Sequence, residues 1–294
     1  MLAKAPTLPA DEVFLDLEDS VAPRAKDEAR EQVGRALAEG DWAHRTVGIR
    51  INGVGTPWAY KDVIAAVEAA PGVVDVLIVP KVERSSDVVF VDRLLTMVEE
   101  TVFGDGGDHK RIGIEAQIET ATGLRNIHEI AHASPRMEAL VFGPADMSAS
   151  LGLPATTAGL PMPGYPGDHW HWVLVTIVVA ARDAGLDAVD GPYLRIEDLD
   201  GFRDAAIRAR ALGYDGKWAL HPSQIEPLNE VFTPTQKEFD RASAMVEAYE
   251  HAISVEGRGA VMFGSEMIDE ASRKMAVRLV ARGRAAGLVP GQTP

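Results

Sequence analysis

The sequence predicts an α/β protein built as a parallel (β/α)₈-type barrel, and three observations lead to this fold class. Short runs of β-branched and apolar residues alternate along the chain with longer segments of helical periodicity. The apolar runs are continuous, as in strands that are covered on both faces. The chain has 294 residues, of which 46% are hydrophobic, and it is therefore long enough to bury one large core.

Seven segments have the composition of buried strands. In chain order they are residues 13–19, 46–52, 73–81, 111–120, 137–146, 186–193 and 216–222. Helices are predicted between them. Residues 26–40 begin with acids and stop at Gly40, and residues 198–213 carry apolar side chains at helical spacing. A closed barrel of this class has eight strands, so the predicted count is one short.

The last part of the chain has a different pattern. Helical periodicity covers residues 237–252 and 272–287, with a glycine-rich break at 257–265 that we interpret as a linker to a flap. We therefore predict a barrel domain over residues 1–233 and a helical extension over residues 234–294. Such an extension would pack on a neighbouring subunit, which requires a homo-oligomer.

Composition excludes several classes of protein. The net charge of −15 argues against nucleic-acid binding, because there is no basic stripe to neutralise phosphates. Without cysteine the chain has no disulfide, thiolate zinc site or cysteine nucleophile. The first residues resemble no signal peptide, and the apolar run at 173–181 is too short to span a membrane. We expect a cytoplasmic protein that does not contact membranes.

Polar residues follow the predicted strands where each strand ends. They are Glu18, Asp19, Arg50, Asn52, Lys81, Glu119, Asp146, Asp190 and His221. Barrel and open α/β enzymes place their chemistry at the carboxyl ends of parallel strands. The alternative is that the strands simply become polar where they meet solvent.

Two of these residues suggest a metal site. Glu119 and Asp146 end successive strands, so a barrel would place them side by side. Two carboxylates, with water and substrate in the other positions, suit Mg²⁺ better than zinc. The alternative is a salt-bridged pair that caps the following helices, with Asp146 as a helix N-cap.

Several ordered motifs together resemble the HpcH/HpaI aldolase and citrate lyase β-subunit superfamily. They are LDLEDSVAP with KDEAR, VGIRINGVGTPW, IVPKVE, the segment from IETATGLR to FGPADMSASLG, GKWALHPSQIEPLNEVFTPT and the late GSEMID. The similarity runs over nearly the whole chain. The insert LPATTAGLPMPGYPGDHWHW followed by DGPY is most similar to the malyl-CoA lyase branch.

The resemblance implies a fold and a chemistry. It implies a (β/α)₈ barrel with a C-terminal helical extension, and a Mg²⁺-dependent enzyme with Mn²⁺ as the alternative ion. The implied reaction is reversible carbon–carbon cleavage of a 3-hydroxyacyl-CoA, such as malyl-CoA, to an acyl-CoA and a 2-oxo acid. Trimers or hexamers are the implied assemblies. Close alternatives are citramalyl-CoA or β-methylmalyl-CoA as substrate, and thioesterase chemistry at the same site.

The resemblance also assigns roles to six residues. The metal ligands fall on Glu119 and Asp146, and the substrate-binding arginine falls on Arg50. Glu18 and Asp19 match positions that hold metal-bound waters. An aspartate that reaches the active site of a neighbouring subunit falls on Asp269. No residues are assigned to coenzyme A.

Each of these residues has a simpler interpretation. Arg50 could pair with Glu18 or Asp19, and Asp269 could be a helix N-cap. We interpret Lys81 as a structural cation that balances the acidic rim, in preference to a Schiff-base lysine. His221 is expected to order its loop. The run HWHW at 169–172 suits a helix start or a lid better than a metal cluster.

One feature departs from the family pattern. Family members begin with an arginine-containing strand ahead of the segment matched by residues 2–19, and we expect this strand to be missing here. In the family this strand contacts coenzyme A. Of the properties that the resemblance implies, affinity for coenzyme A is therefore the one that its loss affects most. A shortened, inactive subunit with a structural or regulatory role is therefore the alternative of another class.

Overall fold

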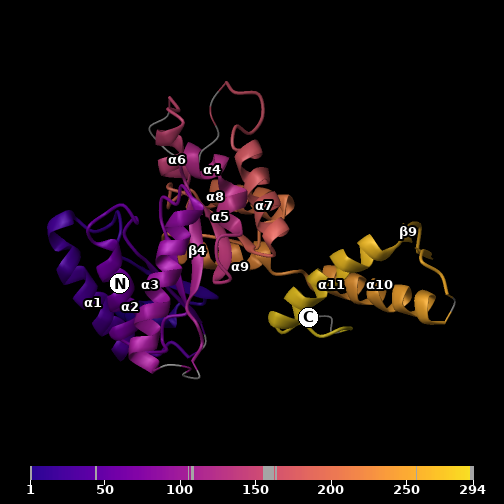
Figure 1. The fold of residues 1–294 in the computed structure, drawn as a ribbon. Helices are drawn as coiled ribbons and strands as arrows, with labels where there is room; N and C mark the ends of the chain where they lie inside the picture. Colours follow the sequence, from indigo (N-terminus) through magenta and orange to yellow (C-terminus); the bar gives the residue numbers. More distant parts are fainter. Residues whose placement is uncertain are drawn as a thin grey trace. The chain divides into compact units, whose positions relative to one another are not determined.

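The computed structural model describes residues 2–43, 45–104, 106, 109–154, 162, 164–255 and 257–291 (Figure 1). The chain forms two compact units, Met1–Leu228 and Asn229–Pro294. The first unit contains the predicted barrel strands and the second contains the predicted helical extension. Each unit is described separately below.

The first unit is a seven-stranded parallel sheet whose strand order follows the sequence. Its strands are β1 (Glu12–Asp16), β2 (Thr46–Arg50), β3 (Val76–Val79), β4 (Gly113–Ile118), β5 (Met137–Phe142), β6 (Asp187–Asp190) and β7 (Gly216–Lys217). Each strand lies within a predicted segment. The predicted segments are longer because they include the polar residues that follow each strand. The α/β barrel architecture predicted from the sequence is thus confirmed.

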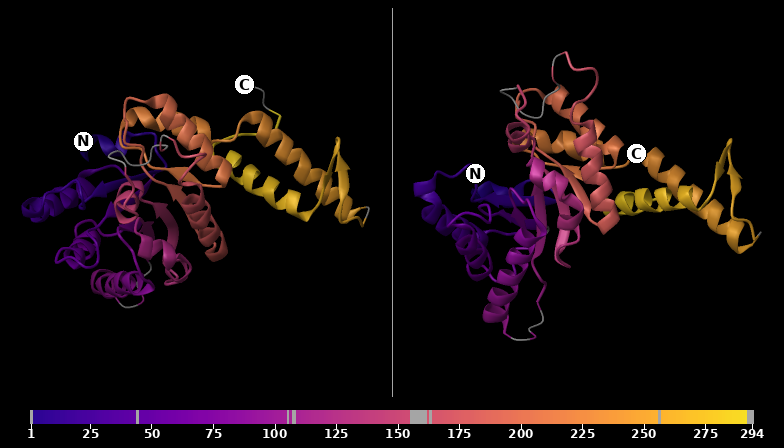
Figure 2. Two further views of the ribbon diagram at one scale, coloured as in Figure 1. Left: turned by 90° about the horizontal axis from the view of Figure 1, so that it is seen from above. Right: turned by 45° about the horizontal axis from the view of Figure 1, so that its top comes forward.

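Helices connect the strands and lie outside the sheet (Figure 2). They are η1 (Leu2–Thr7), η2 (Pro23–Ala25), α1 (Lys26–Glu39), α2 (Ala59–Glu68), α3 (Ser85–Phe103), α4 (Ala121–Arg125), α5 (Ile127–Ala131), α6 (Pro144–Ser150), α7 (His171–Ala184), α8 (Leu199–Leu212), η3 (Pro222–Gln224) and α9 (Ile225–Phe232). Because helices cover the outer face, β3 and β4 are buried along their whole length.

The sheet curls until its two edge strands meet through side chains. Ile78, Val141 and Trp218 form an apolar cluster against which Phe14 and Val189 pack. These residues come from β1, β3, β5, β6 and the end of β7, so they can touch only across the inner face. The Phe14 and Trp218 rings lie 4.5 Å apart. No ladder joins β7 to β1 in the described residues, which agrees with the predicted count of seven strands.

The amino end of the sheet carries a second group of acids. Glu12 on β1 and Glu115 on β4 share a side-chain hydrogen bond, and Glu138 on β5 lies close enough to influence both. Burial raises the pKa of Glu12 to about 7. Burial and the charge of Glu12 raise the pKa of Glu115 as well. Burial therefore favours the protonated form of both carboxyl groups.

The second unit is a helical hairpin with a small β-hairpin between its helices. It contains α10 (Gln236–Ser254), β8 (Val261–Phe263), β9 (Glu266–Ile268) and α11 (Glu270–Ala285). Phe239, Ala242, Ala276 and Val280 form its core. The glycine-rich break predicted as a linker is in fact this antiparallel hairpin. Gly264, with φ of 60°, supplies the left-handed conformation that a two-residue hairpin turn requires.

Within the described residues, no helix is both long and apolar enough to cross a bilayer.

Candidate active site

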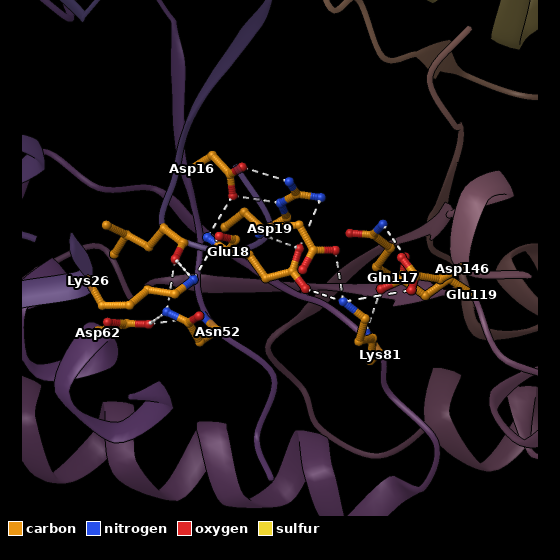
Figure 3. A network of polar contacts seen from close by, with 12 residues as sticks. Asp16, Glu18, Asp19, Lys26, Asn52, Asp62, Lys81, Gln117, Glu119 and Asp146 are labelled. Carbon is orange, nitrogen blue, oxygen red and sulfur yellow. Dashed lines mark hydrogen bonds and ion pairs between the residues drawn. The ribbon is translucent and has the colours of Figure 1, made fainter. Parts of the chain in front are cut away.

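Six of the residues predicted at the carboxyl ends of the strands come together in one network. Figure 3 shows the acids of the β1 loop facing Lys81, with Glu119 and Asp146 on its other side. The network contains Glu18, Asp19, Arg50, Lys81, Glu119 and Asp146. The structure therefore brings these six side chains together, and their role as a functional site stays a prediction.

Arg50 is held chiefly by Asp16. Its Nε and Nη2 donate to the two carboxylate oxygens of Asp16 at 2.8 and 2.7 Å, while Nη1 lies 3.6 Å from Glu18. We predicted Glu18 or Asp19 as the alternative partners. Asp16 takes this place because Asp16 and Arg50 lie opposite each other in the β1–β2 register. Burial alone would raise the pKa of Asp16, but the hydrogen bonds and charge of Arg50 outweigh it and lower the pKa.

Lys81 joins the two halves of the network. Its ammonium pairs with Glu18 and with Asp19, the latter at 3.0 Å, and lies 3.8 Å from Asp146 Oδ1. Its backbone N–H donates to Glu119 Oε1 at 2.7 Å. Burial opposes protonation, yet Glu18 and Asp19 raise the pKa of Lys81 overall. A lysine kept protonated is a poor nucleophile, so these contacts favour the structural cation over the Schiff base.

The backbone of Lys81 is unusual. With φ of 53°, it has the left-handed conformation that residues other than glycine rarely adopt, and it is the one such residue in the described chain. This conformation directs the N–H to Glu119 while the side chain reaches Glu18. Strain of this kind persists where surrounding contacts fix it, and it is common at functional sites.

Glu119 is the most enclosed acid of the network, at 2% exposure. Its Oε2 accepts a hydrogen bond from Gln117 Nε2 at 2.6 Å. Burial and then the charge of Asp146 raise the pKa of Glu119 to about 8, although the Lys81 N–H opposes the shift. Gly143 allows this packing, because a Cβ there would lie 2.3 Å from Glu119 Oε2. The sequence alone did not single out Gln117.

Asp146 lies in the first turn of α6, and its side chain is 37% exposed. Gly143 is the N-cap of α6. Thr120 is the N-cap of α4, the helix that follows Glu119. Neither Glu119 nor Asp146 is therefore an N-cap, so the alternative interpretation, in which this pair caps the following helices, is wrong. They face one network instead.

Three residues beneath the site hold the loop that follows β1. Lys26 Nζ donates to the carbonyl oxygens of Leu17 and Glu18 at 2.8 and 2.7 Å. Asn52 donates to the Leu17 carbonyl at 2.9 Å and to Asp62 at 2.6 Å. Lys26 and Asp62 were not predicted as site residues. Local sequence patterns do not predict this role, because the contacts join residues that lie 8 to 35 positions apart in the sequence.

Two other predicted rim residues have local structural partners. Asp190 forms a buried ion pair with Lys217 at 2.7 Å. His221 Nδ1 accepts the Ser223 N–H at the start of η3, as expected of a residue that orders its loop. No contact joins either residue to the network in the part of the chain that the structure describes.

Asp269 belongs to the second unit, where it is the N-cap of α11. Its carboxylate accepts the Ser272 N–H at 3.1 Å, and this hydrogen bond lowers its pKa. The N-cap interpretation is thus confirmed within one chain. A role in the active site of a neighbouring subunit stays a prediction.

The run at 169–172 is a helix start. Trp170 is buried against Phe142, with ring centroids 5.2 Å apart, and α7 begins at His171. Residues 155–161 and 163, the middle of the predicted lid, lie outside the described residues.

The donors of the network fit a hard divalent cation. Glu119 and Asp146 repel each other, as the raised pKa of Glu119 indicates, and a dication would relieve that repulsion. Gln117 Oε1 adds a buried acceptor that has no hydrogen-bond partner among the described residues. No cluster of three or more His, Cys, Asp or Glu side chains suited to a metal occurs in the described residues, so water and substrate would complete the coordination.

Comparison with known proteins identifies the family of the chain. The family model described as HpcH/HpaI aldolase/citrate lyase matches residues 1–222. The chain belongs to this family. The resemblance predicted from the sequence motifs is therefore confirmed.

Curated relatives of this family member cover most of its length. It is 39% identical to the L-malyl-CoA/beta-methylmalyl-CoA lyase of Rhodobacter capsulatus, over 94% of this chain and 88% of that protein. It is 32% identical to the citrate lyase subunit beta of Escherichia coli, over 98% of this chain and 90% of the relative. The enzyme is thus a carbon–carbon lyase of the CoA-thioester type.

A solved structure has the same architecture. CitE from Mycobacterium tuberculosis, crystallised with magnesium, acetoacetate and coenzyme A, superimposes with a TM-score of 0.72. The two chains are 27% identical, and the match covers 94% of this chain and 90% of CitE.

Proposed function

We propose that this lyase uses Mg²⁺ to cleave and form L-malyl-CoA or a close 3-hydroxyacyl-CoA, with acetyl-CoA and glyoxylate as the partners of the condensation. The observation that carries the proposal is the pair Glu119 and Asp146, set beside Arg50 and Lys81 at the carboxyl ends of the strands. The names of the curated relatives support the same substrate class. Mn²⁺ would be accepted at the same oxygen donors.

Glu119 and Asp146 are the residues that would hold the metal. When bound, Mg²⁺ supplies Lewis acidity and a template for the carboxylate and hydroxyl of the substrate. Glu18 and Asp19 would order water at its edge, and Lys81 keeps both acids in place through its ion pairs. The magnesium in the crystal structure of CitE from M. tuberculosis supports this choice of ion.

Arg50 provides fixed positive charge where an oxyanion develops. Retro-Claisen cleavage turns a hydroxyl into a carbonyl and leaves a thioester enolate, so negative charge must be stabilised as the bond breaks. The bidentate contact with Asp16 would hold the guanidinium of Arg50 in this orientation. A hydrogen-bond donor that is already in position stabilises the transition state more in a site with little water than it would in bulk solvent.

Proton transfer at the acetyl-CoA methyl group is assigned to Asp269 of a neighbouring subunit. The second unit exposes apolar side chains near Asp269, among them Met262, Met267 and Met275, at 61%, 70% and 68%. Three exposed methionines within one short segment are typical of a surface that another subunit covers. Burial on assembly would raise the pKa of Asp269 towards that of a useful base. A trimer or hexamer would provide such contacts.

A direct assay tests the reaction. Acetyl-CoA, glyoxylate and Mg²⁺ should yield malyl-CoA, detected by mass spectrometry, and EDTA should abolish the product until Mg²⁺ is restored. Failure to form malyl-CoA, with a functional lyase assayed in parallel, would remove the proposed substrate. Release of coenzyme A from malyl-CoA without glyoxylate would instead identify a thioesterase.

Subunit mixing tests the assignment of Asp269. Arg50→Met and Asp269→Asn should each be inactive alone. Hetero-oligomers from an equal, random mixture should recover about a quarter of the activity, because about half of the sites keep Arg50 and about half of those receive an intact Asp269. Light scattering gives the oligomer size in the same experiment, and mixtures without recovered activity would contradict the shared site.

A further inference from the structure

A buried ion pair joins the carboxyl ends of β6 and β7. Asp190 and Lys217 lie opposite each other in the register of these strands, and their side chains are only 3% and 4% exposed. Lys217 Nζ lies 2.7 Å from Asp190 Oδ2. Taking two charges out of water costs free energy that their attraction often fails to recover. Stability alone therefore does not account for this pair.

The ion pair holds the backbone of the next residue, Gly191. Asp190 Oδ1 accepts the Gly191 N–H at 2.8 Å, and Lys217 Nζ donates to the Gly191 carbonyl oxygen at 2.5 Å. The two charged side chains thus bind both polar groups of one peptide backbone. Hydrogen bonds to charged groups are roughly twice as strong as those between neutral groups, so Gly191 is firmly fixed.

Gly191 in turn packs closely against the start of α6. A Cβ at this position would lie 2.2 Å from the Phe142 carbonyl oxygen and 2.4 Å from Pro144 Cδ. Pro144 is buried in the first turn of α6, where Ser148 Oγ donates to its carbonyl oxygen at 2.7 Å. A backbone carbonyl and a proline ring yield little, so the position of Gly191 and the position of this helix turn depend on each other.

Asp146 lies in the same turn, two residues after Pro144. Its side chain is 37% exposed, and its ion pair with Lys81 is long, at 3.8 Å. The backbone of α6 therefore does more than side-chain packing to set where this carboxylate lies. A shift of the helix start would move Asp146 relative to Glu119, which is anchored on a different strand.

We propose that Lys217 and Asp190 are positioning residues of the active site. Their clamp on Gly191 holds the start of α6, and with it Asp146, where a metal can be shared with Glu119. This inference rests on the proposed function, which makes Asp146 a metal ligand. Mg²⁺ demands near-ideal octahedral geometry, so a small displacement of one ligand weakens its binding. The buried charges thus serve geometry where they do little for stability.

A second clamp of the same construction provides the control. Arg136 and Glu99 form a pair whose side chains are 2% and 3% exposed, with a separation of 2.6 Å. Glu99 Oε1 accepts the Ile112 N–H at 2.9 Å, and Arg136 Nη1 donates to the Ile112 carbonyl oxygen at 2.9 Å. Ile112 lies just before β4, at the end of the sheet opposite to the site. This clamp should therefore affect stability and leave metal binding unchanged.

The main test is the double variant Lys217→Met with Asp190→Asn. It removes both charges, so no buried ion is left unpaired, and the asparagine oxygen can still accept the Gly191 N–H. Its melting temperature should fall by no more than about 5 °C. Its affinity for Mn²⁺ should fall about 10-fold, at the lower end of the change expected when groups that orient metal ligands are replaced.

Two further variants separate positioning from loss of stability. Glu99→Gln breaks the second clamp, so its melting temperature should fall at least as far while its Mn²⁺ affinity stays within about twofold of the wild type. Gly191→Ala keeps both charges, but its Cβ must displace Pro144 or the Phe142 carbonyl group. It should weaken Mn²⁺ binding as well, and it decides the question if the double variant does not fold.

The experiment is a titration of the full-length, metal-free protein with Mn²⁺, followed by electron paramagnetic resonance, together with thermal unfolding of each variant. Wild-type Mn²⁺ affinity of either the folded double variant or Gly191→Ala would contradict the proposed route through Gly191. An equal loss of affinity in Glu99→Gln would also overturn it, because a general loosening of the fold would then explain the result. If the wild type itself binds no Mn²⁺, the proposed function and this inference fail together. Wild-type binding that the variants share would reject only the positioning role.

Discussion

The two ends of strand β1 carry acids that behave in opposite ways. On β1, Glu12 at the amino end has a pKa raised to about 7 by burial, whereas Asp16 at the carboxyl end has a lowered pKa. Burial pushes both upward, but Asp16 has the bidentate guanidinium of Arg50 and Glu12 faces Glu115. The comparison teaches that a matched cation, and not exposure, lets Asp16 hold negative charge inside the barrel, whereas burial and the charge of Asp146 raise the pKa of Glu119 at the same end.

An apolar layer separates the two ends. Phe14 lies between Glu12 and Asp16 on the inner face of β1, and it packs with Ile78, Val141 and Trp218. These residues pack through apolar surfaces, and no hydrogen bond between the two groups of acids is seen among the described residues. We therefore expect substitutions at the amino end to change stability, and substitutions at the carboxyl end to change binding and catalysis.

The largest effect is expected at the proposed metal ligands. Glu119→Gln and Asp146→Asn each remove a charge that the cation requires, so kcat/KM for malyl-CoA should fall at least about 1,000-fold, with loss of Mg²⁺ binding by calorimetry. Glu115→Gln, on the same strand at the other end, is the control and should stay within about threefold. An equal loss of kcat/KM in all three variants would contradict the expected difference in function between the two ends of the sheet.

A smaller effect is expected for Arg50→Met. Loss of one preorganised donor to a developing oxyanion should lower kcat about 100- to 1,000-fold. It also leaves Asp16 without its partner, at a cost on the order of 3 kcal/mol in the free energy of unfolding. Denaturant titration and single-turnover kinetics measure the two effects.

The double variant Arg50→Met with Asp16→Asn sharpens this result. It removes the orphaned charge, so it should recover most of the stability and none of the rate. Recovered activity would show that Arg50 acts only by neutralising Asp16.

The smallest effect is expected at the amino end and depends on pH. Glu12 has a pKa of about 7 when folded against 4.5 for the free group, so the folded state binds more protons between these values. The free energy of unfolding should therefore fall as pH rises from about 4.5 to about 7. Glu12→Gln should be more stable than the wild type by about 1 kcal/mol at pH 8 and no more stable at pH 4.

Chemical denaturation at both pH values tests this difference. Glu39→Gln, at the exposed end of α1, serves as the control and should change stability by less than about 0.5 kcal/mol at either pH. A gain by Glu12→Gln that is equal at the two pH values would contradict the shared proton.

Local patterns predicted most of the fold. Seven strands were predictable because continuous apolar runs are properties of short segments, and six site residues followed because parallel strands share one carboxyl end. The β8–β9 hairpin was missed because its strands are only three residues long and are flanked by glycines, a pattern that also suits a linker.

Other parts of the site depend on contacts that no local pattern encodes. The pairing of Asp16 with Arg50 follows from strand register, 34 positions apart in sequence. The free oxygen of Gln117 becomes visible only when the partner of its nitrogen is known. The role of Asp269 depends on a second subunit, which the sequence of one chain does not place.

The closure of the barrel by aromatic side chains has one more consequence. Trp218 packs against Phe14 with tilted rings and lies 5.5 Å from the guanidinium of Arg50. An indole so close to a charge that ligands would engage is an intrinsic fluorescent reporter. The arrival of substrate should be readable from the emission of unlabelled protein, without a dye or a coupled assay.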